Sequence, residues 1–220
     1  MLKNNRTFFL LFACFMVVGG VLLATIEQGD GIRYFSENRS VAGDQFFAWF
    51  TKVGEEFMYL GFFISFLFIR YRYSLLIAIS GLLALVVSFL LKMIFGHPRP
   101  SVYFREAGVL DQINTIDGVH LLSGHMSFPS GHTTSAFVLF GVVALLFARK
   151  WYWNGLIFLV ALLIGISRMY LVQHFLKDVY TGAITGVLLS ILVYWVNERY
   201  TYDDKRWLDR SILWKGKDGA

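Results

Sequence analysis

Residues 74–95 read SLLIAISGLLALVVSFLLKMIF, an apolar run in which the single charged side chain is Lys92. A helix of about 20 such residues crosses the hydrocarbon core of a bilayer, which is roughly 30 Å thick. Backbone amides in lipid must be paired within their own segment, so the run predicts a transmembrane helix. This run, with the polar residues that follow it, decides the class of fold.

Similar runs recur on both sides of it. Hydrophobic residues make up 56% of the chain and charged residues 16%, whereas soluble domains carry about 25% charge. We therefore expect an all-α, polytopic membrane protein that forms a single domain over residues 1–220, without a soluble partner domain. The six expected transmembrane spans are Thr7–Ile26, Phe57–Ile69, Ser74–Phe95, His132–Ala148, Trp151–Ser167 and Val179–Val196, of which the second is short and needs residues from both flanks.

The first run could be mistaken for a secretory signal peptide. No small-x-small cleavage site follows it before Glu27, so we expect a retained anchor helix. Its Cys14, the single cysteine, cannot form an internal disulfide and has no neighbouring metal ligand, which makes it packing or lipid-facing bulk.

Basic residues indicate the orientation of the spans. With six spans, most Lys and Arg residues fall in the short turns and termini of one side, which predicts that both termini are cytoplasmic. The basic residues of that side are Lys3, Arg6, Arg70, Arg72, Arg149, Lys150, Arg199, Lys205, Arg206, Arg210, Lys215 and Lys217.

Long loops belong to the opposite, outer side. The first, Gln28–Glu56, contains Phe46, Phe47, Trp49 and Phe50, which predict an interfacial helix lying on the membrane. The second covers residues 96–131. The inner turns are short, so a site with many polar groups is expected on the outer side.

The remaining charges favour contact with lipid. The net charge of +5 is modest and brackets apolar runs, so nucleic acid is not an expected partner. The basic tail, residues 198–220, is expected to lie near anionic lipid on the cytoplasmic side. Gly182-x-x-x-Gly186 predicts close helix packing, for which contact inside one bundle is favoured over dimerisation, and the oligomeric state is left open.

Three polar clusters lie at the outer ends of the last four spans. The first, KMIFGHPRP, holds Lys92, Arg99 and Pro100. A charge inside an apolar helix is costly and suggests function, although a lysine that snorkels to the surface explains it equally well. The prolines end the helix and fix the direction of the outgoing chain.

The second cluster is Pro129-Ser130-Gly131-His132, directly before the fourth span. Ser130 is a favourable N-cap, and the unpaired amides of a helix start can bind an anion. Gly131 lets that anion approach the backbone. An ordinary capped helix would have the same letters.

The third cluster, SRMYLVQHFLKD, contains Ser167, Arg168, His174 and Asp178. His174 and Asp178 are four residues apart, the spacing that brings side chains together on one face of a helix. A carboxylate on one ring nitrogen fixes the tautomer and frees the other nitrogen for attack. A structural pair that caps the last span is the alternative.

Together, the clusters supply three cations, an amide cradle and two histidines at one membrane depth. Phosphoryl transfer needs positive charge around the phosphate, a nucleophile and an acid for the leaving group. Metal-binding patterns such as H-E-x-x-H or C-x-x-C are lacking, so we expect no metal and no cofactor.

The three clusters resemble the signature of the type-2 phosphatidic acid phosphatase superfamily of lipid phosphatases. K-x6-RP, PSGH and SR-x5-H-x3-D stand in order within residues 92–178. The resemblance implies a metal-independent lipid phosphatase that works through a phosphohistidine. It also implies that His174 is the nucleophile, that Asp178 orients it and that His132 protonates the leaving lipid alkoxide. The implied phosphate-binding residues are Lys92, Arg99, Ser130, Gly131 and Arg168.

The expected reaction is hydrolysis of phosphatidylglycerophosphate to phosphatidylglycerol and phosphate, with activity on related lipid phosphates. Undecaprenyl-diphosphate hydrolysis is the alternative within the class. A lipid transporter or flippase is the alternative from another class, but repeated halves and broken mid-membrane helices are not evident. Transfer of the phosphate to an alcohol instead of water also stays open. A lipid phosphate and membrane lipids are the expected partners.

Overall fold

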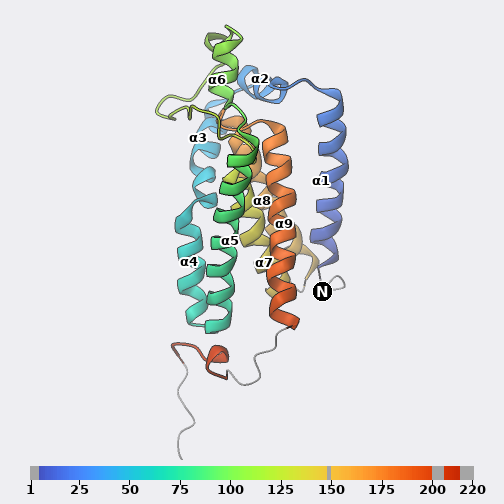
Figure 1. The fold of residues 1–220 in the computed structure, drawn as a ribbon, viewed down its shortest axis with the longest axis vertical. Coiled ribbons are helices and arrows are strands. Elements are labelled where there is room, and N and C mark those ends of the chain that lie inside the picture. The colour runs from blue at the N-terminus through green and yellow to red at the C-terminus, as the bar shows by residue number, and fades with distance from the viewer. Residues whose placement is uncertain (1–4, 148–149, 200–205, 214–220) are drawn as a thin grey trace, which may run out of the picture.

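Six helices of 12 to 25 residues form an antiparallel bundle in the computed structural model, which describes residues 5–147, 150–199 and 206–213 (Figure 1). Short helices and loops cover the end of the bundle opposite to the start of α1. The six helices are α1 (Arg6–Thr25), α4 (Glu56–Leu67), α5 (Tyr71–Phe95), α7 (Gly131–Phe147), α8 (Trp151–Tyr170) and α9 (Leu176–Arg199). The shorter elements are α2 (Asp30–Glu37), α3 (Val41–Phe50), η1 (Thr51–Gly54), α6 (Pro100–Glu106), η2 (Leu110–Gln112) and η3 (Arg206–Asp209).

The apolar helices confirm an all-α, polytopic membrane fold. The helices α1, α5, α8 and α9 are long and apolar enough to cross a membrane, whereas α4 and α7 are shorter apolar helices. Twelve residues make α4 about 18 Å long. The short second span, expected to need residues from both flanks, is lengthened on its N-terminal side only: η1 and α3 continue its column toward the loop-covered end (Figure 1), while α4 itself ends at Leu67. Six full crossings remain a prediction.

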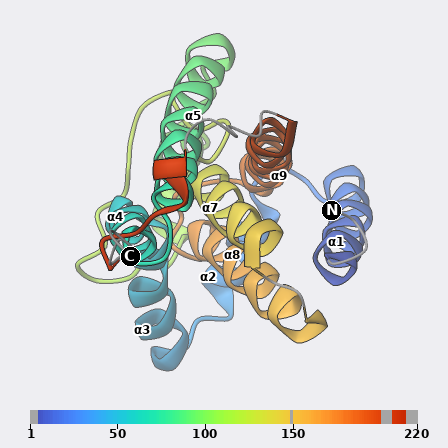
Figure 2. The same cartoon turned by 90° about the horizontal axis from the view of Figure 1, so that it is seen from below.

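The central helix of the bundle is α7, which packs against α5, α8 and α9. Figure 2, viewed along the bundle, shows α7 surrounded by its neighbours, while α1 lies at the periphery beside α8 and α9. A helix that is apolar on all sides is stable when it is buried on all sides. Accordingly, most side chains of α7 are buried, and its N-terminus is a fixed platform for the PSGH residues.

Small residues let α9 approach α7 closely. A Cβ atom on Gly186 would lie 2.5 Å from Cβ of Phe137 and 2.7 Å from the carbonyl oxygen of Thr134. A Cβ atom on Gly182 would lie 2.8 Å from the carbonyl oxygen of Ser130. The Gly182-x-x-x-Gly186 pair therefore serves packing within this bundle, as the sequence suggested.

Replacing Gly186 by valine should destabilise the protein. Overpacking a close helix contact costs about 1–3 kcal/mol, which corresponds to a melting temperature lower by roughly 2–10 °C for a chain of this size. Gly61→Val is the matched control, because nothing lies within 4 Å of a Cβ atom at Gly61. Thermal unfolding in detergent measures both variants, and equal melting temperatures would contradict the packing argument.

The basic turns gather at the end of the bundle where α1 begins (Figure 1). There the η3 segment docks on the α4–α5 turn: Arg72 contacts Asp209 at 3.0 Å, and the amide of Tyr71 donates to the carbonyl of Arg210 at 2.9 Å. This arrangement agrees with the expected grouping of charges, but the side of the membrane stays a prediction. Of the charges used for it, Lys3, Arg149, Lys205, Lys215 and Lys217 lie outside the described residues, as does much of the 198–220 tail.

The helix expected in the first outer loop is present as α3. Ser40 caps it by accepting a hydrogen bond from the amide of Gly43 at 3.1 Å. Trp49 is 66% exposed and Phe46 is 43% exposed, which suits contact with lipid head groups. Its position at a membrane surface remains a prediction. Cys14 is a free, exposed thiol on α1, in agreement with a lipid-facing role.

Candidate active site

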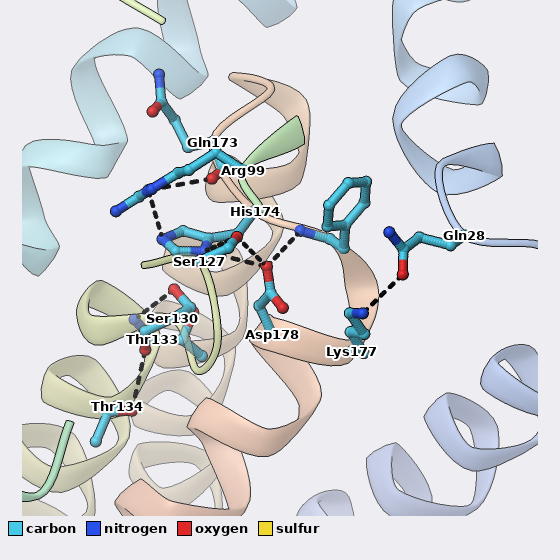
Figure 3. Close-up of polar contacts among 11 residues, drawn as sticks. Gln28, Arg99, Ser127, Ser130, Thr133, Thr134, Gln173, His174, Lys177 and Asp178 are labelled. Carbon is cyan, nitrogen blue, oxygen red and sulfur yellow. Dashed lines mark hydrogen bonds and ion pairs between the residues drawn. The ribbon is translucent and has the colours of Figure 1, made fainter. Parts of the chain in front are cut away.

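All three polar clusters meet at the loop-covered end of the bundle. Lys92 stands in the last turn of α5, and Arg99 is the N-cap residue of α6. The PSGH residues begin α7, Arg168 is near the end of α8, and Asp178 is in the first turn of α9. Figure 3 shows the central part of this group, with Arg99 and Asp178 on opposite sides of His174.

His174 and Asp178 form the buried centre of the site. Their side chains are 2% and 0% exposed, and Nδ1 of His174 lies 3.3 Å from Oδ2 of Asp178. His174 stands in the turn before α9 and not on the helix, so the spacing of four residues works through a helix start. Asp178 Oδ2 also accepts the amide of Phe175 at 3.0 Å, which closes this turn.

The contacts of His174 define its tautomer. Nη1 of Arg99 lies 3.3 Å from Nε2 of His174 and also donates to the carbonyl of Gln173 at 3.3 Å. A guanidinium only donates, so Nε2 must present its lone pair and the proton resides on Nδ1, facing Asp178. The arrangement leaves Nε2 as a nucleophilic nitrogen.

The surroundings keep this imidazole neutral. Burial lowers the pKa of His174 to about 4, and the cations Arg99 and Arg168 act in the same direction, while Asp178 opposes them. Burial likewise lowers the pKa of Arg99, although an arginine stays protonated at neutral pH. Near neutral pH, the site therefore holds a neutral histidine among cations.

The turn that carries His174 has a strained residue. Val172 has a φ of 57°, in the left-handed region that a β-branched residue rarely adopts. It is buried in a small apolar cluster with Ile32, Phe104 and Phe175. The amides of Gln173 and His174 both donate to the carbonyl of Arg168, at 2.9 and 3.1 Å. Packing and these hydrogen bonds hold the turn and fix the position of His174.

The start of α7 is capped as expected and faces Lys92. The amide of Thr133 donates to Oγ of Ser130 at 3.4 Å, and the hydroxyl of Thr133 does so at 2.9 Å. A Cβ atom on Gly131 would lie 3.7 Å from Nζ of Lys92. Lys92 therefore turns toward the α7 N-terminus, which favours a functional lysine over one that snorkels away from the site.

Arg168 is held by a residue from the first outer loop. Its Nη1 donates to the hydroxyl of Thr51 at 2.7 Å, and Arg168 and Thr51 are both buried. Its Nε has no hydrogen-bond partner among the described residues. The guanidinium is thus fixed on one side and retains a free donor, as an anion site requires.

A cavity of about 810 Å³ runs from the polar cluster along the helices α4 and α5. Lys92, Gly131, His132 and Glu55 stand at its polar end. Its walls then become apolar along one face of α5, with Phe89, Leu85, Leu82 and Ala78. From Lys92 to Ala78 this face is about 21 Å long, the length scale of a lipid tail.

The structure brings together every site residue that the sequence indicated and adds three others. Ser127 lies against both His174 and Asp178, Thr51 binds Arg168, and Glu55 lines the cavity. Ser127 stands two residues before Pro129-Ser130-Gly131-His132, but a serine near a turn is too common to be a signal. Thr51 and Glu55 belong to a distant loop, so no spacing rule could have found them.

The donor set does not suit a metal ion. Within the part of the chain that the structure describes, no three His, Cys, Asp or Glu side chains form a metal-binding group. The site instead combines a buried histidine–carboxylate pair with the cations Lys92, Arg99 and Arg168. Such a set suits a phosphate group bound next to an apolar tail.

Comparison with known proteins agrees with a site of this kind. Residues 71–202 match the PAP2 superfamily, and the chain belongs to that family. PAP2 phosphatases hydrolyse lipid phosphoesters, and the family is metal-independent.

Curated relatives carry different substrate names. The chain is 33% identical over 121 residues to the lipid A 4'-phosphatase of Porphyromonas gingivalis, covering 54% of this chain and 47% of the relative. It is 31% identical over 127 residues to the undecaprenyl-diphosphatase BcrC of Bacillus subtilis, covering 56% of this chain and 57% of the relative. The chain thus spans about half the length of these relatives.

Two solved structures share the fold. LpxE of Aquifex aeolicus aligns with a TM-score of 0.63 and 27% identity, over 76% of this chain and 93% of that one. The PAP2-type phosphatidylglycerolphosphate phosphatase of Bacillus subtilis aligns with a TM-score of 0.62 and 23% identity, over 91% of this chain and 98% of that one. The second likeness concerns the fold alone.

Proposed function

We propose that the protein hydrolyses phosphatidylglycerophosphate to phosphatidylglycerol and phosphate through a phosphohistidine at His174. The observation that carries this proposal is the buried His174, whose Nδ1 faces Asp178 and whose Nε2 faces Arg99. A nucleophile oriented by a third group is the arrangement that covalent phosphoryl transfer requires.

In the first step, Nε2 of His174 attacks phosphorus and the bond to the lipid oxygen breaks. His132, at the polar end of the cavity, protonates the departing alkoxide. The phosphoryl oxygens are bound by Lys92, Arg99, Arg168, the Ser130 hydroxyl and the Gly131 amide. Arg99 would then exchange its contact with Nε2 for a phosphate oxygen, which frees the lone pair for attack.

In the second step, water attacks the phosphohistidine and the nitrogen–phosphorus bond breaks. His132 is neutral after giving its proton to the alkoxide, so it can accept a proton from this water. Phosphate leaves and His174 returns to its starting state. The same clamp stabilises the equatorial oxygens in both steps.

The lipid enters sideways from the bilayer in this proposal, with its tails along α4 and α5. Both termini face the cytoplasm and the site faces the outer side, because the basic turns gather at the opposite end. Binding along the Phe89–Ala78 face keeps the tail apolar while the phosphate reaches Lys92.

The choice of substrate rests on overall likeness. In length and fold the chain resembles the phosphatidylglycerolphosphate phosphatase of Bacillus subtilis along nearly its whole length. Undecaprenyl diphosphate is the second candidate, supported by the likeness to BcrC.

A substrate panel tests the proposal. The purified protein in detergent with excess chelator would receive phosphatidylglycerophosphate, undecaprenyl diphosphate, phosphatidic acid and lipid A side by side. We expect chelator-resistant phosphate release that is fastest with phosphatidylglycerophosphate. A faster rate with another lipid would overturn the substrate, and no release from any of them would overturn the hydrolase reading for these lipids and favour transport or phosphotransfer.

The cavity predicts how tail length affects turnover. Ala78 is exposed at the far end of the apolar face, so Ala78→Trp should block this end without disturbing the core. Displacing two methylenes, at about 0.8 kcal/mol each, lowers kcat/KM for long-chain lipids by roughly tenfold and spares short-chain analogues. The control is Ile79→Trp, an exposed neighbour that does not line the cavity. Equal losses with long and short chains would count against tail binding here.

A further inference from the structure

Ser127 lies outside the three sequence clusters, yet its side chain touches both members of the buried pair. Its hydroxyl donates to Oδ2 of Asp178 at 2.6 Å and lies 3.4 Å from Nδ1 of His174. The residue is fully buried. In Figure 3 the hydroxyl lies beside the imidazole, on the side that faces the carboxylate.

The backbone around Ser127 ties it to the other parts of the site. Its amide donates to the carbonyl of His97 at 3.0 Å, and the amide of Arg99 donates to the carbonyl of Gly124 at 2.9 Å. The amide of Ser130 donates to the carbonyl of Asp178 at 3.0 Å. The segment from 124 to 130 therefore fastens Arg99 and the α9 start to each other, with Ser127 in the middle.

The two carboxylate oxygens of Asp178 differ in their number of hydrogen-bond partners. Oδ2 receives the Ser127 hydroxyl, the Phe175 amide and the imidazole, whereas Oδ1 has no hydrogen-bond partner among the described residues. The contact with the imidazole is the longest of the three, at 3.3 Å. One oxygen thus carries three donors, and the rotation of the carboxylate depends on the shortest contact, that of Ser127.

We propose that Ser127 is a positioning residue whose hydroxyl fixes the Asp178 carboxylate against Nδ1 of His174. The inference rests on the proposed role of His174 as the nucleophile. The Ser127 hydroxyl contacts Asp178 and the Nδ1 side of the imidazole, away from the attacking Nε2, so it acts through Asp178 and not on the phosphate. Without the Ser127 hydroxyl, the carboxylate can rotate so that either oxygen faces Nδ1 of His174. The imidazole then keeps its acceptor but loses its defined direction.

The Ser127 hydroxyl also weakens the attraction between the Asp178 carboxylate and a protonated His174. A carboxylate that accepts a short hydrogen bond is a weaker acceptor for the Nδ1 proton than one that has lost this bond. Removing the hydroxyl should therefore stabilise the imidazolium and raise the pKa of His174. The other charged or titratable groups near His174 are Arg99 before α6, Arg168 on α8 and His132 on α7, while Lys92 on α5 interacts with Asp178.

The test compares Ser127→Ala and Ser127→Cys with Ser101→Ala. Cysteine nearly keeps the shape of serine but is a weak donor. Ser101 is a matched control, because it is also a buried serine and its hydroxyl donates to the carbonyl of Leu122 at 2.6 Å, away from the pair. Melting temperature, kcat and KM are measured for each variant.

We expect both Ser127 variants to fold and kcat to fall by roughly 10- to 100-fold, because small misplacements of a reacting group have effects of this order. KM should stay within about twofold, and Ser101→Ala should keep the kcat of the unmodified protein. Protonated His174 cannot attack, so the acidic limb of the kcat/KM profile should move to higher pH in the Ser127 variants. Unchanged kcat, or an unchanged acidic limb, would overturn the inference.

A second readout does not depend on turnover. The chain has five histidines, so ¹⁵N-histidine NMR with a His174→Ala reference can assign and titrate His174. Its pKa should rise in both Ser127 variants and stay unchanged in Ser101→Ala. If the protein hydrolyses no lipid phosphate, the proposed function fails, yet the titration still decides whether Ser127 controls the pair. Failure of both Ser127 variants to fold would make the hydroxyl structural and would also overturn the inference.

Discussion

Replacing His174 by alanine should lower phosphate release from any lipid substrate by at least about 10⁴-fold, because removal of a covalent nucleophile eliminates the reaction path. His174 is 2% exposed, and the cations Arg99 and Arg168 stay in place around it. Substrate binding should therefore survive. The measurement is phosphate release, together with the ³²P label that the protein retains after acid-free quenching.

The matched control for this experiment is His125→Ala. His125 is exposed in the second outer loop and stands outside the motif positions. The His125→Ala protein should keep the rate of the unmodified protein and should still form the labelled histidine. The His174→Ala protein should form none. Residual turnover within tenfold of normal in a folded His174→Ala protein would rule out this residue as the nucleophile.

The pair of His174 and Asp178 illustrates how far sequence reasoning reaches. A spacing of four residues selected the correct partners, but the expected geometry was that of one helix face. In the structure His174 lies in a turn held by the strained Val172, and Asp178 reaches back from the first turn of α9. Local spacing could identify the pair because both residues stand on one short segment, whose turn keeps them within reach.

The contacts that join distant segments could not be predicted in this way. Thr51 and Arg168 are 117 positions apart, and Ser127 and Asp178 are 51 apart. No periodic pattern links such residues, since their meeting depends on how α3, η1 and the second loop fold over the bundle. Hydrophobic runs, in contrast, depend only on the thickness of the bilayer. The limits of α1, α5 and α9 therefore agree with the expected spans within about three residues at each end.

The same contrast explains the second span. Composition located α4 but could not say how a twelve-residue helix is completed. The structure places η1 and α3 above it, and a Cβ atom on Gly54 would lie 2.5 Å from Cγ2 of Ile164 and 3.8 Å from Cδ2 of His132. The segment that lengthens the helix therefore also forms a wall of the active site, and this double role brings Thr51 and Glu55 to the phosphate clamp.

Replacing His132 by alanine should have an effect that depends on the leaving group. His132 stands at the polar end of the cavity, near the place where the lipid oxygen departs. General acid catalysis contributes about 10²- to 10⁴-fold, so hydrolysis of an alkyl lipid phosphate should fall by that factor. An aryl phosphate, whose leaving group needs no proton, should form the phosphohistidine at nearly the normal rate.

The two steps can then be separated in one protein. If His132 also activates the water, the His132→Ala protein should release the aryl alcohol in a burst and accumulate labelled His174, because the second step lacks its base. Rapid-quench measurement of the burst and of the protein-bound label checks this, with His125→Ala as the control. Equal losses for alkyl and aryl substrates would contradict the acid role, whereas a fast second step without accumulated label would assign water activation to another group. The ratio of the two losses thus measures how much of the barrier His132 lowers by protonation, independently of how tightly the lipid tail is bound.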